Sequence, residues 1–253
     1  MTDLSNRTIL VVGASAGIGR ESARWFAEHG AKVVAVGRRA DRLDELAASG
    51  TFAHPITVCA ADVTGAGEPE RVAAVAAAAL GPIDLVLYGA AISPMGMLAD
   101  TDAATWTDVL VTNVVAPSQV CRAVLPHLAP DAIVAFMSSE SVGRPRKALV
   151  PYTTSKAALE ELVRGWRTEH PDVRFSTICV GATIGTDFSR DFGGDILGDA
   201  LMDWIRTGHL PERNMDPPEV GEALAQVLAV AMVHPGVDVT TFAIQPPGPL
   251  ASL

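Results

Sequence analysis

The hydrophobic residues of this chain fall into short, uniformly apolar runs that alternate with longer, Ala-rich amphipathic stretches. Several short runs are apolar throughout, which is typical of parallel strands covered on both faces. The expected strands cover residues 8–12, 32–36, 56–60, 84–88, 132–137, 174–180 and 237–244, and the expected helices cover 17–29, 39–48, 68–80, 102–125, 152–169 and 217–232. This alternation predicts an α/β fold, a single domain over 1–253 with one doubly wound parallel sheet of seven strands.

The segment from Gly181 to Asp216 does not follow this pattern, because it is rich in Gly and Asp and carries GGD at 193–195. A long irregular segment between a strand and a late helix is usually functional and often acts as a lid. We therefore expect a substrate loop at about 186–215. A plain surface loop is the alternative.

Composition and charge narrow the class of protein. Of the 253 residues 49% are hydrophobic, and the formal net charge is −10. The negative charge argues against a nucleic-acid binder, which needs a basic face. The polar start MTDLSNRT does not resemble a signal peptide, and the longest apolar runs, 72–80 and 223–233, are shorter than the ~20 residues of a membrane span. These features predict a cytoplasmic protein with no nucleic-acid or membrane partner.

The cysteines and histidines show no disulfide or metal pattern. Cys59, Cys121 and Cys179 are odd in number and far apart, so we expect buried thiols in a reducing compartment. The six histidines are scattered, with no pair at the spacing of metal ligands. We therefore expect no metal.

A glycine-rich turn, VVGASAGIG, follows the first expected strand directly. Its three glycines permit a tight turn and let the backbone approach a pyrophosphate, and the helix that begins there offers free N–H groups and the positive end of its dipole. The expected cofactor contacts in this turn are Gly13, Ser15, Ala16, Gly17, Ile18 and Gly19. A turn of this kind between the first strand and the first helix favours a Rossmann-type dinucleotide site.

The end of the second expected strand favours NADP(H) over NAD(H). An NAD site usually has an acid there that bonds the ribose hydroxyls, but this chain has Gly37 followed by Arg38 and Arg39. Guanidinium groups pair with a 2′-phosphate, which an acid would repel. The alternative is that both arginines are only solvated. Asp62 and Val63, after the third strand, are expected at the adenine edge, and a turn or cap role is the alternative for Asp62.

Tyr152 and Lys156 lie one helical turn apart in PYTTSK, so they share a helix face. A phenol titrates near 10, and a nearby ammonium favours its ionised form. Lysine is a compact cation that can also reach the ribose hydroxyls of a cofactor. Such a tyrosine could give a proton to a carbonyl oxygen as hydride arrives at the carbon, but the spacing Tyr-x-x-x-Lys is common and by itself does not indicate this chemistry. Thr153, Thr154 and Ser155, between them, need only be small.

Two more residues complete a recognisable order. Ser139 lies thirteen residues before Tyr152, just past the fifth expected strand, and Asn113 lies within the long helix before it. The order of glycine turn, Asn, Ser and Tyr-x-x-x-Lys resembles the classical short-chain dehydrogenase/reductase family over almost the whole chain. The resemblance implies that Tyr152 is the acid–base residue, and that Lys156 binds the nicotinamide ribose and lowers the tyrosine pKa. It implies that Ser139 bonds the substrate oxygen and that Asn113 holds a water in a proton relay. Ser138 rivals Ser139, but the spacing favours Ser139.

The chain keeps some small residues of the family pattern and departs from others. It has YGAA at 88–91 where the family usually has Asn-Asn-Ala-Gly, so Ala90 can pass close to a cofactor but Tyr88 must change the local hydrogen bonding. It has Val180 before Gly181, where the family usually has Pro-Gly. The resemblance implies that backbone groups of 180–184 contact the nicotinamide amide, with Thr183 or Thr186 near the phosphates.

The expected substrate pocket is mostly apolar. It is formed by 92–97, 141–147 and 187–210, and the large residues of the last segment are Phe188, Phe192, Leu197, Met202 and Trp204. Met202 and Trp204 can alternatively form the buried side of a short helix. Arg144, Arg146 and Lys147 can attract an anionic group, but we expect them to be solvated.

These features predict an NADP(H)-dependent oxidoreductase that interconverts a ketone or aldehyde and an alcohol on an apolar small molecule. The alternative is a catalytically inactive NADP(H)-binding sensor or scaffold, which has no need of Ser139, Tyr152 and Lys156 together. An epimerase or dehydratase of the same family usually has a longer C-terminal substrate domain, so we do not expect one. The resemblance implies a homodimer or homotetramer formed through the helices at 102–125 and 152–169.

Overall fold

A computed structural model describes residues 3–189, 192 and 194–249. The strands of the described chain are β1 Thr8–Val12, β2 Lys32–Gly37, β3 Thr57–Ala60, β4 Ile83–Tyr88, β5 Leu128–Ser139, β6 Arg174–Val180 and β7 Thr241–Ile244. They form one sheet in the order β3-β2-β1-β4-β5-β6-β7, and all neighbours are parallel. The predicted doubly wound parallel sheet is confirmed. From β1 the sheet is extended first on one side by β2 and β3 and then on the other side by β4 to β7. The switch point between β1 and β4 is where such sheets bind ligands.

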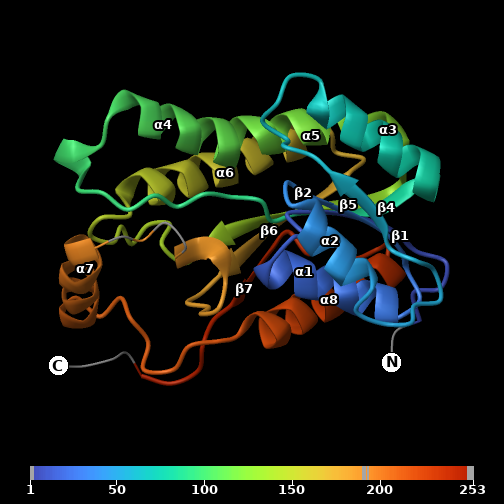
Figure 1. The fold of residues 1–253 in the computed structure, drawn as a ribbon. Helices are drawn as coiled ribbons and strands as arrows, with labels where there is room; N and C mark the ends of the chain where they lie inside the picture. Colours follow the sequence, from blue (N-terminus) through green and yellow to red (C-terminus); the bar gives the residue numbers. More distant parts are fainter. Residues whose placement is uncertain (1–2, 190–191, 193, 250–253) are drawn as a thin grey trace.

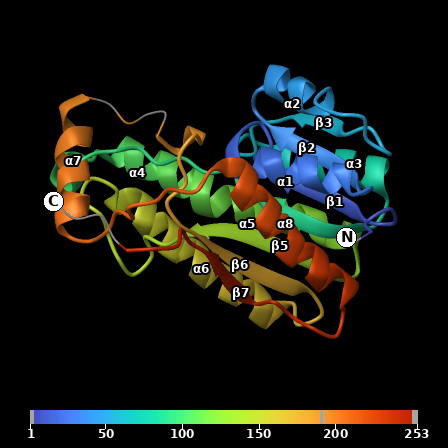
Figure 2. The ribbon, with the colours of Figure 1, turned by 90° about the horizontal axis from the view of Figure 1, so that it is seen from below.

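Helices cover both faces of the sheet (Figures 1 and 2). The helices are α1 Gly17–Glu28, α2 Ala40–Ala47, α3 Glu68–Leu80, α4 Ala103–Leu110, α5 Ala116–Val124, α6 Val150–Glu169, α7 Gly194–Arg206 and α8 Pro217–Val233. Buried residues of α1, α2 and α8 pack with one face of the strands, and those of α3, α5 and α6 pack with the other. The apolar runs of the central strands β1, β2, β4 and β5 are therefore covered on both sides, as their sequence predicts, whereas the edge strand β3 is mostly exposed.

The long helix expected at 102–125 is interrupted. It consists of α4, a π-helical turn η2 (Val111–Val115) and α5, followed by the 3₁₀ turn η3 (Leu125–His127). Within the described chain, Ala103–His127 is the one helical stretch long and apolar enough to cross a membrane by composition, a stretch the sequence reading passed over. Its residues Val109, Val120 and Val124 are buried in this protein, as in a core helix.

The last strand is shorter than predicted. The strand expected at 237–244 begins only at Thr241. The residues before it run alongside β6, but side chains take much of their hydrogen bonding: Ser176 Oγ donates to the carbonyl of Val239, and Arg174 Nη1 donates to that of Val237. Thr177 N donates to Thr240 O, and the regular ladder starts only after that bond.

A helix, α7, occupies part of the segment expected to be an irregular loop. It stands away from the sheet (Figure 1), and Trp204 is 4% exposed against Ala148 and Leu149. The idea that Met202 and Trp204 both form a buried helix side is right for Trp204 and wrong for Met202, which is 54% exposed. Part of GGD at 193–195 lies outside the described residues. The expectation of three buried thiols holds for Cys59 and Cys121, but Cys179 is half-buried.

Gly221 sets the approach of α8 to α1, and its replacement by alanine is expected to destabilise the protein by about 1–3 kcal/mol. A Cβ at Gly221 would lie 2.6 Å from the Cβ of Glu21 and 3.0 Å from the N of Ser22, so the helices would have to separate. Denaturant unfolding measures the change. Gly165→Ala is the matched control, because Gly165 is exposed on α6 with open space around it. That variant should gain up to about 1 kcal/mol, and equal effects at both sites would contradict the packing argument.

Candidate functional site

The glycine turn between β1 and α1 is built by close backbone contacts. A Cβ on Gly13 would lie 2.6 Å from the N of Ala90, and one on Gly19 would lie 2.5 Å from the carbonyl oxygen of Gly13. Gly13 and Gly17 have positive φ values of 94° and 57°, which glycine adopts without strain. The turn therefore leaves an open cradle at the N-terminus of α1, where free N–H groups suit a phosphate.

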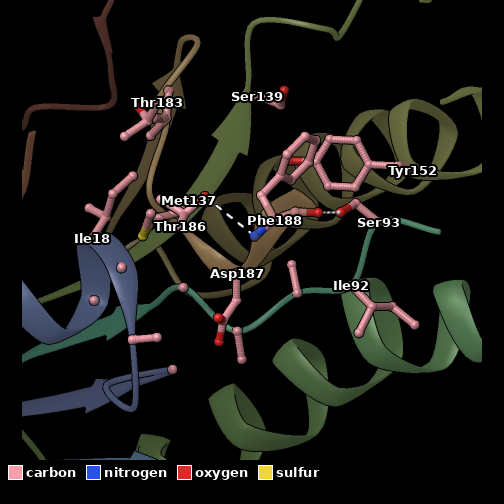
Figure 3. A pocket seen from close by; sticks show the side chains of 18 of the residues that line it. Ile18, Ile92, Ser93, Met137, Ser139, Tyr152, Thr183, Thr186, Asp187 and Phe188 are labelled. Carbon is pink, nitrogen blue, oxygen red and sulfur yellow. Dashed lines mark hydrogen bonds between the residues drawn. The ribbon is translucent and has the colours of Figure 1, made fainter. Parts of the chain in front are cut away.

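A cavity of about 720 Å³ runs from this turn along the carboxyl ends of the strands. It is lined by the predicted residues Gly13, Ser15, Ala16, Gly17, Ile18, Gly19, Arg38, Arg39, Asp62, Val63, Ala90, Ser139, Tyr152, Lys156, Gly181, Thr183 and Thr186. Figure 3 shows Ile18, Thr183 and Thr186 at one side of this cavity and Ser139 and Tyr152 at the other. The fold thus brings together every predicted site residue except Asn113, which lies behind the wall.

At the end of the cavity beside β2, the two arginines differ. Arg39 Nη2 donates to Ser15 Oγ over 3.1 Å and pairs with Asp187 Oδ2 over 2.5 Å. Arg38 is exposed. The alternative that both arginines are only solvated is therefore wrong for Arg39. The Oδ1 of Asp62 accepts bonds from the N and Oγ1 of Thr64, and the hydroxyl bond is the first cause of a lowered Asp62 pKa.

Tyr152 stands in the first turn of α6 and is 7% exposed. Burial raises the pKa of Tyr152 to about 12, against smaller lowering effects from a hydrogen bond with Ser139 and from the charge of Arg146. Ser139 Oγ lies near the phenol, shares a hydrogen bond with Ser141 Oγ over 3.0 Å and accepts from Ser141 N over 3.2 Å, whereas Ser138 Oγ donates to Glu160 Oε1 over 2.6 Å. Of the two serines, Ser139 is the one in position to share a ligand with Tyr152.

Lys156 is buried one turn after Tyr152, with 3% of its surface exposed. Its Nζ donates to the carbonyl of Met137 over 2.7 Å and lies 5.7 Å from the centroid of the Tyr152 ring. The ammonium faces the ring. The sequence predicted a lowered Tyr152 pKa, but in the protein alone that pKa is raised. The physical reason is burial, which disfavours the charged phenolate. Burial also lowers the pKa of Lys156 to about 8, and the charge of Glu160 opposes that effect.

Lys156 is expected to make the free energy of unfolding increase with pH between about 8 and 10. Its pKa of about 8 in the folded protein lies below the ordinary value of 10.5, so in this window the unfolded chain binds a proton that the folded protein has lost. From about pH 7 to 10, wild type should gain about 2–3 kcal/mol relative to Lys156→Met. Denaturant unfolding measures this with both proteins in a Tyr152→Phe background, because the phenol and the ammonium are coupled and Tyr152 would not cancel. A difference independent of pH would contradict the prediction.

Asn113 lies in the π-helical turn and joins three parts of the chain. Its Oδ1 accepts from the N of Ile92, and its Nδ2 donates to Ile92 O and to Ser155 Oγ, each over 2.9 Å. Ser155 Oγ in turn donates to the carbonyl of Tyr152 over 2.7 Å. Ser155 was expected only to be small, but it is buried and links Asn113 to the backbone of Tyr152. This network fixes the start of α6 against the segment after β4.

The 3₁₀ turn η4 (Asp187–Ser189) covers the phenol from the side of the expected substrate loop (Figure 3). The ring of Phe188 meets that of Tyr152 edge to face, with centroids 5.1 Å apart, and Phe192 meets Phe188 in the same way at 5.2 Å. Ser93 Oγ donates to the carbonyl of Phe188 over 2.6 Å. The sequence placed both phenylalanines at the pocket and included Ser93 and Asp187 in its expected segments, but it did not indicate their partners, Phe188 O and Arg39.

The segment before α6 carries three cations that the sequence predicted to be solvated. This prediction is wrong for at least one of them. Arg146 is 12% exposed and pairs with Glu140, which sequence reasoning missed. Lys147 forms an ion pair with Asp199, and Arg144 is exposed and donates to a backbone carbonyl. The correction matters for Arg146, because it lines the same cavity as Tyr152.

Tyr88, at the departure YGAA, is fully enclosed. Its ring lies 6.1 Å from that of Phe136, burial raises its pKa, and its hydroxyl has no hydrogen-bond partner among the described groups. The expected change in local hydrogen bonding is therefore the loss of a bond at this point of β4. Tyr88 does not line the cavity.

Sequence comparison relates the chain to known enzymes. The model of the short chain dehydrogenase family matches residues 7–195. Gluconate 5-dehydrogenase of Gluconobacter oxydans is 36% identical over 66% of this chain and 66% of its own length. Dehydrogenase/reductase SDR family member 4 of Bos taurus is 32% identical over 74% of this chain and 69% of its own. A fungal short chain dehydrogenase from Pseudocercospora fijiensis is 35% identical, and the match spans about half of that protein, 53%.

Solved structures share the fold. A glucose/ribitol-type short-chain dehydrogenase/reductase from Brucella melitensis has a TM-score of 0.82 at 26% identity, covering 96% of this chain and 97% of that one. An alcohol dehydrogenase from Thermococcus sibiricus, complexed with 5-hydroxy-NADP, has a TM-score of 0.81 at 22% identity, covering 96% and 99%. The family match over three quarters of the chain, the parallel sheet and the glycine cradle agree. This chain therefore belongs to the classical short-chain dehydrogenase/reductase family of oxidoreductases.

Proposed function

We propose that this protein is an NADP(H)-dependent oxidoreductase that interconverts a ketone or aldehyde and an alcohol. The observation that carries the proposal is the burial of Tyr152 and Lys156, with Ser139 beside the phenol, in the cavity that begins at the glycine turn. Three polar side chains buried together at one cavity are costly for folding. Their cost is understandable if they act on a ligand, and their types suit proton exchange with a carbonyl oxygen.

The cradle at Gly13 and Gly17 fits a dinucleotide, because its backbone contacts leave no room for side chains where a pyrophosphate would approach. When bound, the nicotinamide supplies or accepts a hydride at the substrate carbon. The half-buried Arg39, held to Ser15 in the same turn, supports a role in binding a 2′-phosphate. Gly37 supports it too, because no acid follows β2 to repel that phosphate. Thr183 and Thr186 line the cavity beyond the turn and suit hydrogen bonding to the cofactor.

The positions of the side chains indicate which group donates the proton. Tyr152 stays protonated at neutral pH, since its pKa is about 12 in the protein alone, and so it can donate to the carbonyl oxygen during reduction. Ser139 adds a second hydrogen bond to the same oxygen. The Lys156 ammonium lies 5.7 Å from the centroid of the Tyr152 ring, and its charge favours the phenolate that remains. Asn113 and Ser155 position the start of α6, and thereby Tyr152.

The test is to measure turnover of a panel of carbonyl compounds with NADPH and with NADH. Turnover is measured as the loss of absorbance of the reduced nicotinamide, and the alcohol product is identified. Activity that is greater with NADPH supports the proposal. Tight NADPH binding with no turnover on any substrate would favour the sensor or scaffold alternative. We also propose a homodimer or homotetramer in the cytoplasm, since the family is typically oligomeric, and sedimentation of the purified protein measures its assembly.

A further inference from the structure

A buried ion pair lies in the same cavity as Tyr152. Glu140 and Arg146 come from the segment between β5 and α6, and their side chains are 17% and 12% exposed. Arg146 Nη2 donates to Glu140 Oε1. Desolvation of such a pair costs about as much as its attraction returns, so apolar residues of similar size would stabilise this segment equally well. Stability alone therefore does not explain why two charges are buried here.

Arg146 keeps hydrogen-bonding capacity that the protein does not use. Its Nε is buried and has no hydrogen-bond partner among the described residues. The guanidinium carbon lies 5.8 Å from the ring centroid of Trp204, which is itself 4% exposed and fixed by a bond from Nε1 to Lys147 O. Buried donors in native proteins are nearly always satisfied. This Nε has no exposed surface, so a ligand oxygen in the cavity must bond instead to the terminal N–H groups of Arg146, which lines the cavity.

Glu140 is held at the reaction centre by the backbone on its other side. A Cβ on Gly181 would lie 3.0 Å from Glu140 Oε2, so the glycine makes room for the carboxylate. Arg146 lowers the pKa of Tyr152 and Glu140 raises it, so both charges act on the phenol. A small molecule whose carbonyl reaches Tyr152 can therefore reach this pair with another part of its structure.

We propose that Glu140 and Arg146 form a subsite for a neutral oxygen substituent of the substrate, best a hydroxyl group, and this proposal rests on the proposed function. A hydroxyl can accept a bond from Arg146 and donate one to Glu140. A carboxylate suits the pair less well, because the pair has no net charge and Glu140 repels an anion. The apolar wall of the cavity, with Phe192, Leu201 and Leu210, suits the carbon chain between the two oxygens.

The test compares methyl ketones that end in a methyl, a hydroxymethyl or a carboxylate group, over a range of spacer lengths. With NADPH, kcat/KM of wild type should be about tenfold or more higher for the best hydroxyl ketone than for its methyl counterpart, as expected for a hydrogen bond to a charged group. In the double variant Glu140→Gln, Arg146→Met this ratio should fall towards one. Removing both charges avoids a buried unpaired charge, which would threaten folding. The ratio is taken within each enzyme, so a general loss of activity cancels.

The double variant Glu45→Gln, Arg42→Met is the matched control, because it removes an exposed ion pair from α2, whose residues do not line the cavity, and its ratio should equal that of wild type. A wild-type ratio near one, a preference for the carboxylate, or an unchanged ratio in the Glu140 and Arg146 variant would overturn the subsite. A second readout is the binding of ketones to the protein in the presence of NADP⁺, measured by tryptophan fluorescence. The variant Trp204→Phe shows which part of the signal comes from Trp204. Preferential binding of hydroxyl ketones without turnover would keep the subsite and refute the proposed function. Turnover without a preference for hydroxyl ketones would support the proposed function and refute the subsite. If the protein shows neither turnover nor this preference, both proposals are refuted.

Discussion

Replacement of Tyr152 by phenylalanine is expected to lower kcat for ketone reduction about 10²–10⁴-fold, the contribution of a positioned general acid. The substitution removes only the hydroxyl that faces Ser139, and the ring remains to pack against Phe188. Binding of NADPH should change little, because the glycine turn and Arg39 are untouched. The rate of loss of reduced nicotinamide, together with an independent NADPH titration, separates the two effects.

Tyr88→Phe is the matched control, since Tyr88 is the other of the two tyrosines in the chain. Its hydroxyl is also buried, but it has no hydrogen-bond partner in the described structure and does not line the cavity. Removing an unpaired buried hydroxyl is neutral or stabilising, so this variant should keep wild-type kcat. Equal turnover by Tyr152→Phe and wild type would refute the acid–base role, and a comparable loss in Tyr88→Phe would show a general sensitivity of the core.

The sheet could be predicted from the sequence because its strands are covered on both faces. A run such as Ile9–Val12, in which every residue is buried, has no exposed position to break the apolar pattern. Of the two edge strands, β3 begins within one residue of its predicted start, whereas β7 begins only at Thr241 because the chain before it is held by side chains of β6. Helix α7 was expected only as an alternative to a loop, because Gly and Asp residues interrupt the apolar pattern of a helix whose buried anchor is Trp204.

The motif residues of the site could be predicted because each occurs at a fixed distance along the chain from a strand or helix end. The residues that were missed act through contacts that sequence spacing does not encode. The carboxylate of Glu140 has room beside Gly181, on a neighbouring strand end, because the glycine has no Cβ. Asp187 meets Arg39 across 148 positions of the chain. Periodicity and local motifs contain no information about such pairs, so a structure was needed to find them.

The ion pair between Arg39 and Asp187 changes what is expected of cofactor selection. Arg39→Ala should lower the affinity for NADPH relative to NADH by about 10–100-fold, because a hydrogen-bonded charge pair of about 1.5–3 kcal/mol with the 2′-phosphate is lost. Arg38, which is exposed, should contribute less. Titration of both cofactors against Arg38→Ala and Arg39→Ala measures the two ratios. Arg42→Ala removes the same charge from an exposed position outside the cavity and should leave the ratio unchanged.

Asp187→Asn should shift the ratio in the opposite direction. Asp187 is bonded to Arg39 in the protein alone, so a 2′-phosphate must share the guanidinium with a carboxylate, and like charges close together disfavour that arrangement. The asparagine keeps the shape of the side chain but removes its charge, so NADPH should bind more tightly while NADH changes less. Weaker NADPH binding in Asp187→Asn would mean that the carboxylate holds Arg39 in place for the phosphate instead of competing with it. An unchanged ratio in Arg39→Ala would refute the phosphate role itself, since Arg39 is the half-buried cation that the glycine turn holds at this end of the cavity.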